Sequence, residues 1–207
     1  MNTNNHAPEA EVRTLRQQVK RHLNQPHQFI CITERKIDDI ICLPPPTDYP
    51  GWWGKVGLFK PHFAASRNLW LDLDVCITGS LDGLVTPLTG SQIRIGLNWA
   101  ASGHGGCQSS MMYWERESAR VIYDDFDPAI AHWPPVNKPG VLWGDQEHCT
   151  ALRDDGRLDC EYFSNTDLMS YKYHCQDGLP EGAKVISFHG LPNPADVNDD
   201  WVIKARA

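Results

Sequence analysis

The sequence predicts an α/β fold in which helices flank a mostly parallel sheet. Short apolar runs, typical of buried strands, alternate along the chain with segments whose apolar residues have helical spacing. The 207 residues are 41% hydrophobic and 22% charged, a composition typical of a globular protein with a sizeable core. We expect a flexible polar N-terminus over residues 1–8 and a single domain over residues 9–207.

The first expected element is a helix from Glu9 to Leu23, because Val12, Leu15 and Val19 recur at helical spacing. Apolar runs predict strands at residues 29–32, 40–43, 69–71, 93–97, 111–114 and 184–188. Further helices are expected at residues 52–59, 118–126 and 144–152.

Charge and hydropathy argue against two classes of function. The formal net charge is −7 and no basic block is present, which argues against general nucleic-acid binding. No stretch approaches the roughly 18 apolar residues of a membrane span, and the polar start does not look like a signal peptide. We therefore expect a cytoplasmic protein whose seven cysteines are reduced and mostly buried.

Two carboxylates follow directly after the apolar run at 69–71. Residues two apart in a strand face the same side, so Asp72 and Asp74 would point together. Such carboxylates repel each other, and Mg²⁺ or Mn²⁺ would offset that repulsion while keeping sites for phosphate oxygens. Ligands of open α/β sheets bind at the carboxyl ends of strands, which favours this interpretation. The alternative is a solvated turn before Gly79.

Several segments together resemble a GT-A-type glycosyltransferase, and the pattern is most similar to glycosyltransferase family 8 and the glycogenin-like enzymes. The segments are Trp53–Val56, Leu71–Asp74, Ser80–Leu84, Cys107–Met111, Trp143–Gln146 and Phe188–Gly190. The similarity runs from roughly Val12 to Pro194. Each motif is weak alone, but their order and spacing together are fairly specific.

The resemblance implies a role for each matched residue. Asp72, Asp74 and His189 would hold Mn²⁺ or Mg²⁺. The donor nucleotide-sugar would be bound by Lys55, Asp72, Gln108 and Ser109. Asp145 and Gln146 would lie beside the anomeric carbon of the donor sugar, although Asp145 could also serve as a helix N-cap.

The chain departs from the family pattern in four places. The family's first strand is missing or very short, because the expected helix begins almost at once. The metal-binding histidine of the family commonly stands where this chain has Ser187, two positions before His189. Asn193 replaces a basic residue that would hold phosphate, and Gln108 replaces an asparagine that contacts donor or acceptor.

The sequence therefore predicts a metal-dependent glycosyltransferase, with retention of anomeric configuration expected from the resemblance alone. Its partners would be a UDP- or GDP-sugar donor and an acceptor that the sequence does not identify, and the oligomeric state is left open. The alternative is a degenerate, non-catalytic GT-A domain that binds a nucleotide or glycan or acts as a scaffold. The departures favour the alternative, whereas the intact Asp72, Asp74, Asp145 and Gln146 favour the enzyme.

Overall fold

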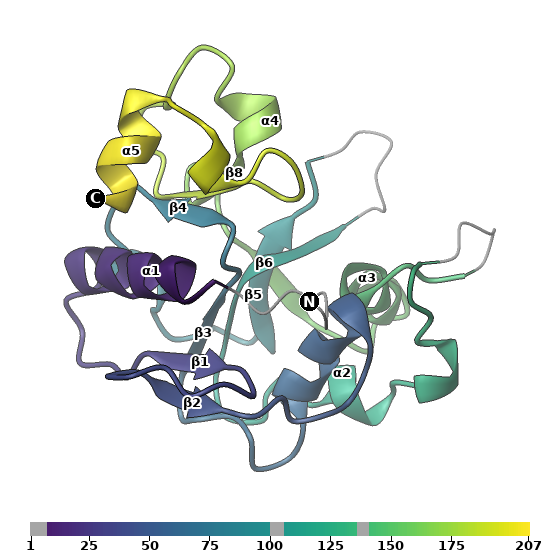
Figure 1. The fold of residues 1–207 in the computed structure, drawn as a ribbon. Helices are drawn as coiled ribbons and strands as arrows, with labels where there is room; N and C mark the ends of the chain where they lie inside the picture. The colour runs from purple at the N-terminus through teal and green to yellow at the C-terminus, as the bar shows by residue number, and fades with distance from the viewer. Residues whose placement is uncertain (1–7, 100–105, 136–140) are drawn as a thin grey trace.

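The computed structural model describes residues 8–99, 106–135 and 141–207, so the expected flexible segment 1–8 lies almost wholly outside the described residues. Figure 1 shows a central group of strands with helices on either side. The α-helices are α1 (Glu9–His22), α2 (Val121–Asp124), α3 (Asp145–Asp154), α4 (Tyr171–His174) and α5 (Asp200–Arg206). Short 3₁₀ helices are η1 (Gly51–Phe59), η2 (Asp82–Leu84), η3 (Pro128–Ile130) and η4 (Pro194–Asp196).

The strands of the described residues form three sheets. The strands are β1 (Ile30–Ile32), β2 (Ile41–Leu43), β3 (Asn68–Leu71), β4 (Val75–Ile77), β5 (Ile93–Leu97), β6 (Cys107–Trp114), β7 (Cys160–Tyr162), β8 (Leu168–Ser170) and β9 (Val185–Ser187). The largest sheet has the order β3-β6-β5-β7, a second has β4-β9-β8, and the third is the pair β1-β2. The α/β class is thus confirmed.

Strand pairing differs in detail from the expected mostly parallel sheet. Among the described strands, β1-β2, β5-β7 and β8-β9 pair in parallel, whereas β3-β6, β5-β6 and β4-β9 are antiparallel. The reason is the position of β6, which is buried along its whole length and lies antiparallel between β3 and β5. A strand that is buried on both faces is a continuous apolar run whether it pairs in parallel or antiparallel. The run alone therefore does not predict the direction of pairing.

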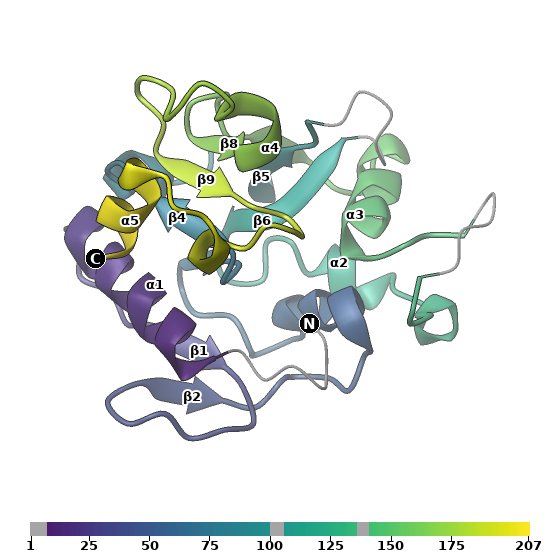
Figure 2. The same ribbon diagram turned by 45° about the horizontal axis from the view of Figure 1, so that its top comes forward.

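The core consists of three apolar clusters that pack the helices against the sheets. Trp53 of η1 and Leu152 of α3 share one cluster with Ile95 of β5. Helix α1 contributes to the second cluster and α5 to the third. Figure 2 shows α1 and α5 next to each other, where Arg206 donates to both carboxylate oxygens of Glu11 at 2.9 Å. None of the helices in the described ranges has the length and hydropathy that crossing a bilayer requires.

Most of the expected elements are present, and three short strands are additional to them. Helix α1 matches the expected 9–23, while 118–126 contains only the one-turn helix α2. The strand expected at 111–114 begins earlier, at Cys107. Strands β4, β7 and β8 lie outside the strands that the sequence predicts, and each has three residues, too few to show a period.

A buried side chain on α1 links this helix to β4. Oε1 of Gln18 accepts a hydrogen bond from the backbone N–H of Ile77 at 2.6 Å, and Gln18 is buried. Replacing Gln18 by Leu leaves this N–H without a partner, so Gln18→Leu is expected to lower the free energy of unfolding by about 1–3 kcal/mol. Gln17→Leu, on the exposed side of the same helix, is the control and should change it by less than about 0.5 kcal/mol. Equal urea midpoints for the two variants would contradict the assignment.

Candidate functional site

The acidic pair lies in the turn that joins two sheets. Strand β3 ends at Leu71 and β4 begins at Val75, so Asp72 and Asp74 lie in the connection and not on a strand face. The N–H of Asp72 donates to the carbonyl of Ser110 at 2.8 Å, and the carbonyl of Asp74 accepts from the N–H of Phe188 at 2.9 Å. The expected strand face is therefore corrected to a turn that is anchored at each end, and not the solvated turn of the alternative.

Lys55 brings a buried positive charge to this turn. Its Nζ donates to Oδ2 of Asp72 at 2.7 Å and to Oγ of Ser109 at 3.1 Å. Oδ1 of Asp72 accepts from Nε1 of Trp70 at 2.8 Å. Burial opposes the ammonium form of Lys55, but the neighbouring carboxylates, Asp72 first among them, leave its pKa raised. The structure thus brings together Lys55, Asp72 and Ser109 of the expected site.

An irregularity between two strands explains how Ser109 reaches this site. Ile95 of β5 pairs with Met112, whereas the next residue, Gly96, pairs with Gln108. The intervening residues of β6, Ser109 among them, therefore have no partner on β5. A Cβ at Gly96 would lie 2.7 Å from the carbonyl oxygen of Gln108, so the close approach of the strands requires glycine here.

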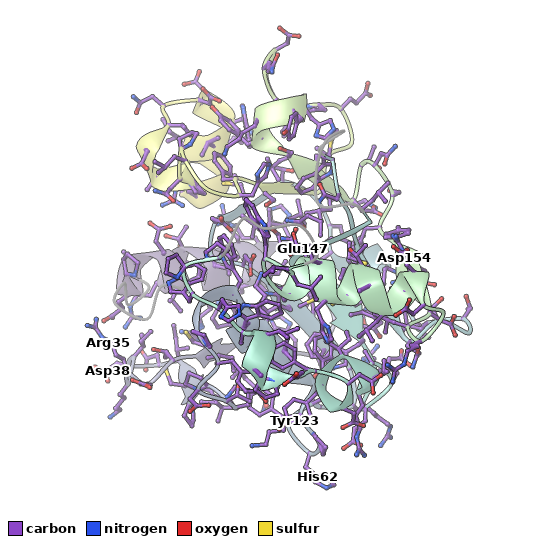
Figure 3. All side chains as sticks on the ribbon, turned by 90° about the vertical axis from the view of Figure 1, so that its right-hand side faces the viewer. Arg35, Asp38, His62, Tyr123, Glu147 and Asp154 are labelled. Atoms are coloured by element: carbon purple, nitrogen blue, oxygen red, sulfur yellow. The ribbon has the colours of Figure 1, made fainter. Side chains whose placement is uncertain are left out.

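Asp145 supplies a second buried carboxylate, at the first residue of α3. Figure 3 shows α3 with Glu147 near the beginning of the helix and Asp154 at its end. Asp145 is 4% exposed, and its Oδ2 is buried with no hydrogen-bond partner. Burial raises the pKa of this carboxyl, although the charge of Lys55 and a hydrogen bond from Ser109 act in the opposite direction. An unsatisfied buried acceptor costs free energy, which a ligand hydroxyl or N–H could recover.

Within the described residues, no cationic side chain forms an ion pair with Asp74. Burial and the charge of Asp72 raise the pKa of Asp74 to about 6, whereas Lys55 and the N–H of Gly190 favour its charged form. Two neighbouring carboxylates thus share one ammonium, and negative charge is in excess. This donor set fits Mg²⁺ or Mn²⁺, which in proteins commonly use one or two carboxylates together with water and phosphate oxygens. Within the described residues, no group of three His, Cys, Asp or Glu side chains could hold a metal by itself.

His189, the expected third metal ligand, has other partners. Its Nε2 lies 2.6 Å from Oγ of Ser170. Its ring stacks on Trp99 at 5.4 Å and on Tyr173 at 6.0 Å between centroids. Burial, followed by the charge of Lys172, lowers its pKa, so the neutral imidazole is favoured. Ligation through Nε2 would require breaking the hydrogen bond to Ser170.

The residues that differ from the family pattern form hydrogen bonds within the protein. The side-chain amide of Gln108 donates to Oγ of Ser110 and accepts from its N–H at 2.9 Å. Ser187 donates to the same Oγ at 2.9 Å. Asn193 caps η4, with its Nδ2 2.8 Å from Oδ2 of Asp196. Gln146 follows Asp145 on α3 and is half-buried.

Sequence reasoning missed the second partner of Asp72. Trp70 stands two residues before Asp72, so the period-2 rule that pairs Asp72 with Asp74 also places Trp70 on that side. In the sequence, Trp70 belongs to an apolar run, and this position hides its contact with Asp72. Trp99 lies far along the chain from the segment that contains Ser170 and Tyr173, and no local pattern connects these residues with His189.

No protein-family model and no curated protein sequence matches this chain. Among solved structures it is similar to the glycosyltransferase GlyE of Streptococcus pneumoniae TIGR4, with a TM-score of 0.72, 13% sequence identity and 95% of this chain covered. It is also similar to the galactosyltransferase LgtC, crystallised with donor and acceptor sugar analogues, with a TM-score of 0.61, 13% identity and 96% coverage. The bifunctional glycosyltransferase WbbM gives a TM-score of 0.64 at 9% identity.

These likenesses confirm the GT-A fold. The chain spans 57% of the GlyE chain, 47% of the WbbM chain and 91% of the LgtC chain. The resemblance noted in the sequence is thus confirmed at the level of fold.

The shifted carboxyl of Asp74 predicts a pH-dependent stability. Its folded pKa of about 6 lies above the ordinary 3.8, so no penalty exists below about pH 4, and the penalty grows as pH rises through 6. Asp74→Asn keeps an acceptor for the N–H of Gly190 but carries no charge. In EDTA, its stability gain over wild type should rise from near zero at about pH 4 to about 1–3 kcal/mol at about pH 7.5. A gain that is constant across this range in urea unfolding would contradict the assignment.

Proposed function

We propose that this protein is a glycosyltransferase that moves a sugar from a UDP- or GDP-sugar to an acceptor, with Mn²⁺ or Mg²⁺ as cofactor. The observation that carries the proposal is a largely buried group of charged and polar side chains in a fold shared with glycosyltransferases. The group consists of Lys55, Asp72, Ser109 and Asp145, and the carboxylate of Asp74 lies beside it. Burying several carboxylates around one ammonium is costly, and such arrangements concentrate at functional sites.

The acidic turn is the proposed diphosphate side of the site. Asp72 and Asp74 would hold the divalent cation, whose chemistry is to neutralise the charge that accumulates on the leaving diphosphate. Lys55 and Trp70 fix the carboxylate of Asp72 through both of its oxygens. A carboxylate held in this way needs little reorganisation when ligand binds. His189 would complete the site only after releasing Ser170.

Asp145 and Gln146 form the proposed sugar side. As the bond between the anomeric carbon and the phosphate oxygen breaks, positive charge develops on the sugar, and a nearby carboxylate stabilises it. The unpaired buried Oδ2 of Asp145 suits this role because no donor among the described residues competes for it. We expect retention of configuration, as in the family that the sequence resembles.

A second candidate is a non-catalytic GT-A domain that binds nucleotide or glycan or serves as a scaffold. Residues that differ from the family pattern favour this candidate, because they form hydrogen bonds within the protein. Gln108 and Ser187 both bond to Ser110, and His189 bonds to Ser170. In this case the protein would bind a nucleotide diphosphate without turning over its sugar.

The first test of the proposal is metal-dependent donor binding. Wild type is expected to bind either UDP or GDP, with the matching sugar nucleotide, in Mn²⁺ but not in EDTA, measured by isothermal titration calorimetry. Asp74→Asn should abolish this binding with the fold intact, because it removes the carboxylate that Lys55 does not pair with and therefore the excess negative charge that attracts the cation.

Asp155→Asn is the matched control, since Asp155 is exposed at the end of α3. It should bind as wild type does. Donor binding by Asp74→Asn at wild-type affinity would refute the metal assignment, and a folded wild type that binds no nucleotide would refute the donor.

Turnover separates the two candidate functions. With water as acceptor, wild type in Mn²⁺ should slowly release sugar from the nucleotide that it binds. Asp145→Asn should lower this rate about 100-fold while changing nucleotide affinity little, since the carboxylate is proposed to act on charge that exists only in the transition state. Binding without measurable sugar release by wild type, with acceptor glycans supplied, would establish the non-catalytic domain instead.

A further inference from the structure

Lys172 of α4 is a lysine whose charge is not neutralised by the residues around it. Its Nζ donates to the backbone carbonyl of His189 at 2.9 Å, and the side chain is half-buried. Within the described ranges no carboxylate forms an ion pair with it, whereas Lys55 pairs with Asp72. An anchored ammonium whose neighbour is a neutral carbonyl keeps its capacity to bind an anion.

The short segment after β9 links this ammonium to the acidic turn. The N–H of Phe188 donates to the carbonyl of Asp74 at 2.9 Å, and the carbonyl of the next residue, His189, accepts from Nζ of Lys172. Nζ of Lys172 lies 3.4 Å from the position that a Cβ on Gly190 would occupy. Gly190 has φ +91°, a conformation that favours glycine. The segment that follows β9 therefore contacts both Lys172 and Asp74, and within the described residues no ion pair joins their side chains.

An ammonium next to uncompensated carboxylates fits a ligand that carries both signs of charge. A free phosphate would be repelled by Asp72 and Asp74, and a free divalent cation would gain nothing from Lys172. A diphosphate complexed with a divalent cation satisfies both, because the cation meets the carboxylates and a phosphate oxygen meets the ammonium.

We propose that Lys172 binds a phosphate oxygen of the metal-complexed diphosphate in the donor. This inference rests on the proposed function and adds a residue from α4, a segment outside every motif noted in the sequence. The proposal also gives the two kinds of charge different roles. The carboxylates of the turn bind the cation, and the ammonium of Lys172 binds the phosphate.

The test compares Mn²⁺ alone with Mn²⁺–UDP and Mn²⁺–GDP as calorimetric probes. Lys172→Met should weaken binding of the preferred nucleotide complex about tenfold or more, with the affinity for Mn²⁺ alone unchanged. Lys172→Arg should restore most of the affinity, because it keeps the charge. Lys204→Met, on the exposed side of α5, changes the net charge equally and should bind as wild type does.

The outcomes separate this inference from the function on which it rests. If wild type binds the nucleotide complex and Lys172→Met binds it equally well, Lys172 is only a tie between α4 and β9, and the inference is wrong while the donor site stands. A loss that Lys172→Arg does not restore, with a lowered melting temperature, also indicates such a structural tie. A folded wild type that binds neither nucleotide complex overturns both.

Discussion

The ion pair between Lys55 and Asp72 is the interaction on which the rest of the site depends. Both groups are largely shielded from water, and removing either partner of a buried pair typically costs about 3–5 kcal/mol. The pair joins η1 to the turn after β3, and the contact of Lys55 with Ser109 adds β6. Three segments distant in sequence are thus joined by one charge.

The same charge explains why the carboxylates differ from one another. Asp72 lies in direct contact with the ammonium, whereas Asp74 and Asp145, the latter on α3, are influenced by its charge. The first is neutralised, and the pKa values of the other two are raised because burial outweighs what Lys55 offers. Three aspartates thus differ in their electrostatic environment because they interact differently with one ammonium. Such differences allow chemically identical groups in one site to have different roles.

Much of the fold and part of the site could be predicted from the sequence, and the remainder could not for physical reasons. Long periodic segments such as α1 were predictable, and so was the acidic pair at the end of β3. The direction of β6 was not, because it depends on which strands flank it. The surroundings of His189 were not predictable either, since Ser170 and Trp99 meet it only in the folded chain. Local sequence patterns therefore identify candidate site residues, whereas tertiary contacts determine which of these side chains are free to bind a ligand.

The turn at Asp72–Asp74 has a consequence for how the molecule comes apart. It is the short covalent link between the sheet that contains β3 and the sheet that contains β4, and its backbone bonds reach β6 and the end of β9. Opening of either sheet would release one end of the turn and separate the carboxylates. Local unfolding in most of this domain is therefore coupled to dismantling of the acidic pair, so a ligand held there would suppress fluctuations of both sheets and make them unfold as one cooperative unit.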